Sequence, residues 1–276
     1  MTSPNDIDAE AFRRFEHDGW DRLCRGYHHH WEHLTTQIIP AMLEAAGVTR
    51  DTSLLDVACG PGYVSGLASR QGADARGVDL SGEMVKLARE NFPALEFQCA
   101  DAEDLPFQDS SFDVVAINFG VVHFPDADGA LREARRVLKP AGRLAFTAWS
   151  GPENSAIGFA LDAISECGTL GVDLPPGPPL FRFASHEECK RTVLGLGFIA
   201  CDCTDHLLHW TLPAPDALMD SFREATARTS GLLGAQKPDV IPAIKAAMTA
   251  RCAPYIERGV AVVPMPAVLA VSAKAS

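Results

Sequence analysis

The sequence predicts an α/β fold in which a largely parallel sheet is covered by helices on both faces. Between residues 52 and 148, short apolar runs alternate with helix-like stretches, the pattern of successive βαβ units. Apolar runs of this kind are typical of strands buried on both faces. The 276 residues are 47% hydrophobic and 22% charged, which is ordinary for a globular chain with one large domain or two small ones.

The elements follow in order. Residues 6–47 read as helices whose apolar stripe ends at Gly47. The expected core strands are 53–57, 75–79, 95–99, 112–117 and 143–149, and the helices between them are 62–70, 81–91 and 127–138. Ser81 is expected to cap the second of these helices, and Lys139-Pro140 with Gly142 to end the third.

The pattern weakens after residue 150. Residues 154–167 and 185–194 are predicted to be helical, and a rigid Pro/Gly-rich connector at 175–179 separates them. Residues 198–212 have strand character, 214–227 and 240–251 read as helices, and 260–273 as a last strand. The chain shows no internal repeat.

Charge and composition narrow the partners. The net charge is −12 with a pI near 5.1, so phosphate backbones and anionic membranes are poor partners and a small molecule is the better expectation. Eight cysteines without a C-x-x-C pair read as reduced thiols of a cytoplasmic protein. The polar start of the chain and the absence of a long apolar run predict neither export nor a membrane span, and the oligomeric state stays open.

The most informative stretch runs from Leu54 to Tyr63, where an apolar strand passes through a small-residue turn into a helix. Gly60 and Gly62 would let a ligand approach the main chain at the helix N-terminus. A dinucleotide fingerprint needs a third glycine one position earlier than Gly66. The carboxylate of Asp56, with no Lys or Arg nearby in sequence, favours a cationic ligand over a pyrophosphate. S-adenosylmethionine, with its ammonium, sulfonium and carboxylate, matches this turn.

Two further acidic positions follow later strands. Asp79 ends the second strand and is placed to accept hydrogen bonds from ribose hydroxyls, which suits NAD equally well. Asp101 and Ala102 follow the third strand, where they could take the amino group and a ring nitrogen of an adenine; a solvated acid is the plainer interpretation for Glu103.

Five motifs follow one another in the predicted core: Asp56-x-Ala58-Cys59-Gly60-x-Gly62, Gly77-Val78-Asp79-x-Ser81-x-x-Met84, Ala100-Asp101-Ala102-Glu103-x-Leu105-Pro106-Phe107, Ser111-Phe112-Asp113-Val114-Val115 and Leu138-Lys139-Pro140-x-Gly142-Arg143. In this order they resemble class I S-adenosylmethionine-dependent methyltransferases, most closely the small-molecule branch that includes the ubiquinone/menaquinone-biosynthesis type. The resemblance is firm over about residues 50–150. Many relatives have Gly at the position of Ala58.

The resemblance implies a Rossmann-like, seven-stranded sheet whose last strand is antiparallel. It also implies roles for the matched positions. The turn with Asp56, Ala58, Cys59, Gly60 and Gly62 would hold the methionine part, and Asn118 would line the methionine side. Asp79 would hold the ribose, Met84 would cover a face of the adenine, Asp101 and Ala102 would meet its edge, and Leu80 is a further cofactor-binding position. We therefore expect one structural domain with three regions: a helical cap (1–50), a cofactor-binding core (51–150), and a remainder (151–276) that completes the sheet and builds the acceptor site.

His123 follows the fourth strand at the edge where an acceptor should lie, so it is the first candidate general base, although packing is an equally ordinary role for it. The run Tyr27-His28-His29-His30-Trp31-Glu32-His33 could suggest a metal, but three adjacent helical histidines cannot converge on one ion, and no metal is expected. Six aromatic residues could surround an apolar acceptor: Phe119, Phe124, Trp149, Phe181, Phe183 and Trp210. Of these we expect two or three to line a pocket.

The predicted function is thus methyl transfer from S-adenosylmethionine to a small-molecule acceptor by in-line displacement. Two alternatives stay open: an NAD-type oxidoreductase of similar fold, and a protein that binds S-adenosylmethionine without catalysis.

Overall fold

The computed structural model describes residues 7–276. Residues 1–6, which carry the expectation about the start of the chain, lie outside the described residues. No helix within the described residues is long and apolar enough to cross a bilayer. All eight cysteines are free.

One sheet organises the molecule. Its strands are β1 (Ser53–Val57), β2 (Asp74–Asp79), β3 (Glu96–Cys99), β4 (Phe112–Ile117), β5 (Leu138–Trp149), β6 (Phe198–Leu212), β7 (Ile256–Glu257) and β8 (Val260–Lys274). Their order is β3-β2-β1-β4-β5-β8-β6, with the two-residue β7 paired to β8. The first five pair in parallel, and β8 runs antiparallel to both β5 and β6. The predicted seven main strands and antiparallel last strand are confirmed; β7 was not predicted.

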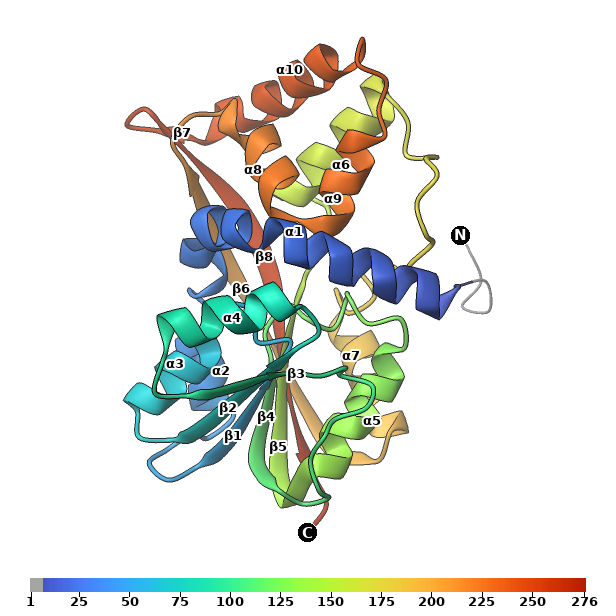
Figure 1. The fold of residues 1–276 in the computed structure, drawn as a ribbon. Coiled ribbons are helices and arrows are strands. Elements are labelled where there is room, and N and C mark those ends of the chain that lie inside the picture. The colour runs from blue at the N-terminus through green and yellow to red at the C-terminus, as the bar shows by residue number, and fades with distance from the viewer. Residues whose placement is uncertain (1–6) are drawn as a thin grey trace.

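Helices cover both faces of this sheet, as predicted (Figure 1). On one face lie α2 (Ile39–Ala45), α3 (Tyr63–Arg70) and α4 (Gly82–Asn91), and on the other α5 (Ala127–Val137) and α7 (His186–Gly195). Each face has its own apolar core, because neighbouring strand residues such as Val114 and Val115 point to opposite sides. Ser81 caps α4 by accepting a hydrogen bond from the backbone N–H of Met84, as predicted.

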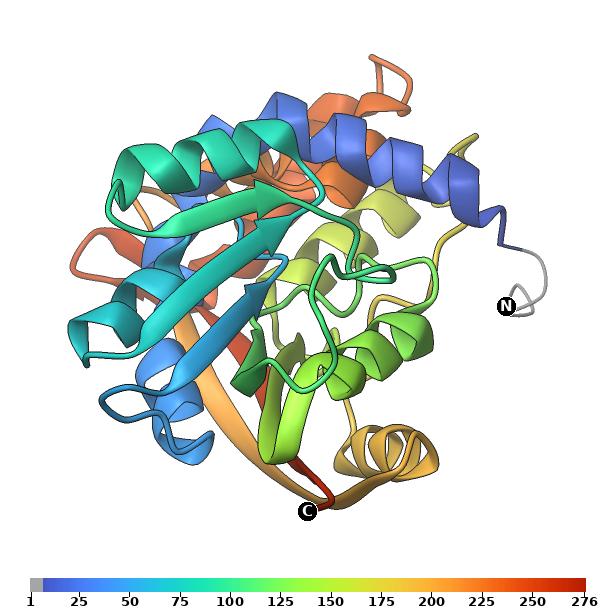
Figure 2. The ribbon, with the colours of Figure 1, turned by 60° about the horizontal axis from the view of Figure 1, so that its bottom comes forward.

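A layer of helices lies beyond the carboxyl ends of the parallel strands. It contains α1 (Ala9–Thr35), α6 (Ala156–Cys167), α8 (Ala217–Ala225), α9 (Ala227–Gly234) and α10 (Ile241–Cys252). Within this layer α1 lies nearest the sheet, between the sheet and the other four helices and next to α4 (Figures 1 and 2). Because all five parallel strands end at this edge, α1 covers the place where ligands of open α/β sheets bind.

Two predicted boundaries differ from the structure. The predicted helix 214–227 is shorter in the structure, where α8 ends at Ala225 because Thr226 has extended backbone angles. The next helix, α9, was not predicted. Strand β5 begins at Leu138 instead of residue 143, and the helix before it ends at Val137. The reason is tertiary: Leu138 pairs with Phe112, and the ammonium of Lys139 binds the carboxylate of Asp113 at 2.9 Å.

Candidate active site

One cavity lies between the carboxyl ends of β1 to β5, α1 and the first turn of α9. Nearly every residue singled out from the sequence lines it: Asp56, Ala58, Cys59, Gly60, Asp79, Leu80, Met84, Asp101, Ala102, Asn118 and His123. Gly62 is the exception. A Cβ at Gly62 would meet the Phe97 ring at 2.8 Å, so this glycine serves the packing of the turn on β3.

The turn after β1 has a left-handed backbone. Gly60 has φ +51°, and a Cβ there would meet nothing within 4 Å, so the backbone is open to the cavity. Ala58 has φ +54°, a conformation that costs about 1–2 kcal/mol for a residue with a Cβ. Its methyl group fits because its neighbour is Gly120, where an added Cβ would lie 2.8 Å from it.

Asp56 is 1% exposed and therefore deeper than the open position at the turn that its sequence suggested. The backbone N–H and hydroxyl of Ser65 donate to its Oδ2 at 3.0 and 2.9 Å, whereas Oδ1 has no partner among the described residues. Burial raises the pKa of Asp56 to about 7, against the lowering effect of Ser65. Its charge thus depends on what occupies the cavity.

Asp79 joins the ends of β1 and β2. Its Oδ2 accepts a hydrogen bond from the Gly60 N–H at 2.8 Å, and its Oδ1 accepts one from the Ser81 N–H at 2.9 Å. Burial raises the pKa of this carboxyl group, while both hydrogen bonds oppose the shift. The two N–H donors fix the carboxylate at the cavity wall, and each oxygen keeps a lone pair for a further donor.

Asp101 is engaged by a residue far away in sequence. Its Oδ2 lies 2.7 Å from Arg13 Nε of α1, and the Glu103 N–H donates to its Oδ1 at 2.9 Å. The same arginine contacts Glu103 at 2.5 Å. Burial raises the pKa of Glu103, which also accepts from the Asp126 N–H and so is not the solvated acid that its sequence position suggested.

Asn118 is held from two sides at the end of β4. Its Nδ2 donates to the carbonyl oxygen of Thr35 at the end of α1, at 3.1 Å, and its Oδ1 accepts from the Thr147 hydroxyl at 2.8 Å. Asn118 therefore links β4 and β5 to α1 at the cavity.

His123 is paired with a carboxylate that the sequence analysis missed. Its Nδ1 lies 3.0 Å from Oε2 of Glu16, which also accepts from the Trp20 indole N–H at 2.8 Å. Because a carboxylate accepts, the contact favours the proton on Nδ1 and leaves Nε2 to accept. Glu16 is 1% exposed, and its Oε1 has no partner among the described residues.

Aromatic residues form much of the remaining wall. Phe119, Phe124 and Trp149 line the cavity, and Phe181, Phe183 and Trp210 do not, so the expectation of two or three is confirmed. The indole of Trp149 stacks on Phe119 with ring centroids 3.9 Å apart. Other elements contribute the aromatic residues Trp20, Tyr27, Trp31, Tyr63 and Phe222.

The histidine run of α1 does not converge. His28 contacts the Tyr63 hydroxyl, His30 lies 2.9 Å from Glu224, and His33 lies 3.1 Å from the Thr211 carbonyl oxygen. No three metal-ligating side chains gather anywhere in residues 7–276. The run joins α1 to three other elements, while Tyr27 and Trp31 face the cavity.

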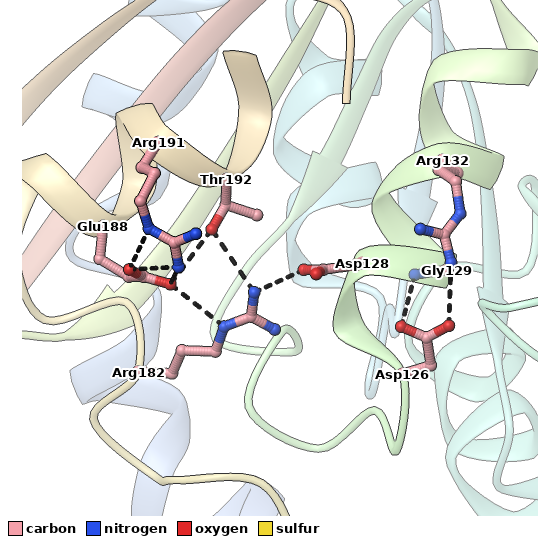
Figure 3. Close-up of polar contacts among 8 residues, drawn as sticks. All are labelled: Asp126, Asp128, Gly129, Arg132, Arg182, Glu188, Arg191 and Thr192. Carbon is pink, nitrogen blue, oxygen red and sulfur yellow. Dashed lines mark hydrogen bonds and ion pairs between the residues drawn. The ribbon is translucent and has the colours of Figure 1, made fainter. Parts of the chain in front are cut away.

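An ion-pair network holds the segment before α7 against α5 (Figure 3). The guanidinium of Arg182 contacts Asp128 at 2.6 Å and Glu188 at 3.4 Å, and Arg191 holds Glu188 from the other side at 2.6 Å. The neighbouring residue Leu180 lines the cavity. The network therefore fixes one wall of the site.

Part of the chain is similar in sequence to known methyltransferases. Residues 55–146 match the family model described as a methyltransferase domain. The ubiquinone/menaquinone biosynthesis C-methyltransferase UbiE of Hahella chejuensis is 36% identical over 154 residues, which is 52% of this chain and 59% of that protein. The demethylmenaquinone methyltransferase of Chlorobaculum tepidum is 39% identical over 121 residues, 44% of this chain and 49% of that protein. Residues 55–146, which match this family model, are called the methyltransferase domain below.

Solved structures extend the similarity of fold beyond this methyltransferase domain. A phosphoethanolamine N-methyltransferase 2 from Haemonchus contortus, solved with S-adenosylhomocysteine, has a TM-score of 0.60 at 19% identity. The aligned region covers 96% of this chain and 60% of that protein chain. The [4+2]-cyclase SpnF has a TM-score of 0.57 at 20% identity, and the aligned region covers 94% of this chain and 95% of that protein chain. The chain spans about half to three-fifths of the length of the curated relatives that it matches.

The methyltransferase domain supplies only one side of the cavity. Glu16 and Trp20 come from α1, and Arg228 comes from α9, so all three lie outside residues 55–146. Glu16 had a signal in the sequence: it lies on the same helical stripe as Phe12, Gly19 and Leu23, where a carboxylate is unusual.

Proposed function

We propose that the chain is an S-adenosylmethionine-dependent methyltransferase that acts on a small-molecule acceptor. One observation carries the proposal: predicted cofactor residues from four separate segments of the methyltransferase domain line a single cavity together with His123. The segments are the turn after β1, the end of β2, the loop after β3 and the end of β4.

In this proposal, the turn from Asp56 to Gly60 holds the methionine part, and Asn118 borders it. Asp79 and Leu80 face the ribose, and Met84 packs on the adenine. Asp101 and Ala102 meet the adenine edge, although Asp101 must share its carboxylate with Arg13.

The unpartnered polar atoms of the cavity fit such a cofactor. Asp56 Oδ1 is a buried carboxylate oxygen without a donor, and an ammonium group would supply one. The Trp31 indole N–H is a buried donor without an acceptor, which a carboxylate would satisfy. A diphosphate would instead lie against Asp56 and Asp79, and Arg13, the arginine at the β3 side of the cavity, already binds two carboxylates.

When bound, the cofactor supplies a methyl group on a positively charged sulfur, which needs no further activation. The chain's residues then have three tasks. The aromatic wall excludes water, α1 and the β4 edge orient the acceptor, and His123 Nε2, with Nδ1 held by Glu16, accepts a proton from an acceptor that has one to lose.

Calorimetry with S-adenosylhomocysteine and with NADH tests this proposal against an oxidoreductase. We expect S-adenosylhomocysteine to bind at micromolar concentrations and NADH not to bind. Asp79→Ala should weaken binding about 10- to 100-fold through loss of charge-assisted hydrogen bonds. Asp74→Ala, at the exposed start of the same strand, is the matched control and should leave binding unchanged. Tight NADH binding would refute the proposal.

Turnover separates methyl transfer from binding alone. Transfer of a labelled methyl group from S-adenosylmethionine to a small molecule of a cell extract would support the proposal that the chain is an enzyme. A chain that binds the cofactor and methylates no small molecule would be the non-catalytic alternative.

A further inference from the structure

A partly buried arginine lines the cavity on the side formed by α9. Arg228 lies in the first turn of α9 and lines the cavity together with Thr226, Ala227 and Thr229. Its Nη1 donates to the Pro178 carbonyl oxygen at 2.8 Å. Among the described residues, the other donors of its guanidinium make no hydrogen bond, and no carboxylate lies within ion-pair distance.

The position of Arg228 is fixed by close helix packing. A Cβ added to Gly19 of α1 would lie 2.7 Å from the Ala227 Cβ, so the first turn of α9 rests directly on α1. The guanidinium lies 5.7 Å from the Phe12 ring centroid. These contacts hold the backbone at the start of α9 and one side of the guanidinium, while Arg228 remains part of the cavity lining.

A second, independent observation lies beside it. Thr229 is 7% exposed, and its hydroxyl makes no hydrogen bond within the described residues although it lines the cavity. The N-cap residue Thr226 makes no side-chain capping bond, so the first N–H groups of α9 lack a side-chain acceptor. Guanidinium, hydroxyl and helix N-terminus are all donors, and all are on one wall.

One carboxylate acts on Arg228 without forming an ion pair with it. This is Glu16, whose Oε2 accepts from Trp20 and His123 and whose Oε1 has no partner among the described residues. Burial lowers the pKa of Arg228, yet a guanidinium keeps its proton at neutral pH. The other lining arginine, Arg13, is paired with Asp101 and Glu103.

On the basis of the proposed methyl transfer, we infer that Arg228 and the first turn of α9 bind an anionic group of the acceptor, a carboxylate or a phosphate, whose apolar body lies against the aromatic wall. An uncharged acceptor that covered this wall would give the guanidinium no charged hydrogen-bond acceptor. The acceptor is therefore an amphipathic acid.

Calorimetry on the protein saturated with S-adenosylhomocysteine tests the inference. The probes are benzoate, phenylacetate and 1-naphthoate, each paired with its uncharged amide, and phenyl phosphate paired with phenol. We expect at least one acid to bind about tenfold or more tighter than its neutral partner. A preference among the carboxylates or for the phosphate identifies the anionic group.

Variants assign the preference to Arg228. Arg228→Met keeps the packing stem and should abolish the preference, Arg228→Lys should retain part of it, and Thr229→Val should reduce it. Arg223→Met, an exposed position of α8, is the matched control and should change nothing. Thermal unfolding of each variant reports whether the fold is intact.

Four results would overturn the inference: no acid binds at millimolar concentrations, the neutral partners bind equally well, the preference survives Arg228→Met, or S-adenosylhomocysteine binding falls in Arg228→Met. In the last case the guanidinium would serve the cofactor carboxylate. If S-adenosylhomocysteine fails to bind the unaltered chain, the proposed function is wrong. In that case the same acids and amides are titrated into the protein without S-adenosylhomocysteine, and the same outcomes decide whether Arg228 binds an anionic group.

Discussion

Cofactor binding should depend on pH through Asp56. Burial raises the pKa of Asp56 to about 7, so in the free protein this carboxyl group is mostly protonated at pH 6 and mostly ionised at pH 8. An ammonium group at Oδ1 favours the ionised form. Binding below pH 7 must therefore release a proton, and affinity must fall as pH falls.

The magnitude follows from that pKa. If only the ionised form binds, the apparent dissociation constant is multiplied by 1 + 10^(pKa − pH). With a pKa of about 7 the factor is about 1 at pH 8 and about 30 at pH 5.5, which corresponds to a loss of about 2 kcal/mol of binding free energy. Calorimetry of S-adenosylhomocysteine over this range, in two buffers of different ionisation enthalpy, measures both the affinity and the released proton.

Asp56→Asn keeps an oxygen that can accept from Ser65 and removes the titrating proton, so binding should be weaker at pH 8 and nearly independent of pH. Asp74→Asn, exposed on β2, should keep the full pH dependence. A flat profile for the unaltered chain, or an unchanged slope in Asp56→Asn, would show that Asp56 does not face the ammonium group.

Three other substitutions test the walls of the site. Gly120→Ala places a Cβ 2.8 Å from the Ala58 methyl group and should lower the free energy of unfolding by about 1–3 kcal/mol in urea titrations; Ala58→Gly should restore part of that loss, and simple additivity would contradict the contact. Arg182→Met removes the ion pairs of Arg182 with α5 and α7, so it should lower the free energy of unfolding by about 1 kcal/mol and expose residues 175–184 to protease. Its control is Arg132→Met, exposed on α5, which should change the free energy of unfolding by no more than about 0.5 kcal/mol. Glu16→Gln should slow turnover of a proton-bearing acceptor about tenfold or more and alter its pH profile without weakening S-adenosylhomocysteine; an unchanged rate would remove His123 and Glu16 from proton transfer.

The cofactor side of the site could be predicted because its geometry is local. The candidate residues lie at the ends of parallel strands or in the turns, loops and first helical turn that follow them, and parallel strands of one sheet end at one edge. Once the strand ends at Val57, Asp79 and Ile117 are known, their loops must meet. The sequence could not show how deep Asp56 lies, because its burial comes from α3 and the helices above the sheet.

The other side could not be predicted because it depends on contacts between distant segments. Arg13 reaches Asp101 across 88 positions of chain, and Glu16 reaches His123 across 107. Neither pairing follows from a motif. The close approach of α1 and α9 at Gly19 is equally non-local, because only the packed structure shows that a side chain at Gly19 would collide with Ala227.

The two sides of the cavity can change independently of each other. A local motif can stay the same while α1 and the helices after β5 change, so one cofactor side can be joined to many acceptor sides. The structure of the [4+2]-cyclase SpnF has the same fold as this chain, so the fold alone does not determine the reaction. The acceptor must therefore be argued from the residues that the motifs leave out. In this chain those residues are a carboxylate–histidine pair and a partly buried arginine without a carboxylate partner among the described residues, and together they favour an acid that has a proton to lose.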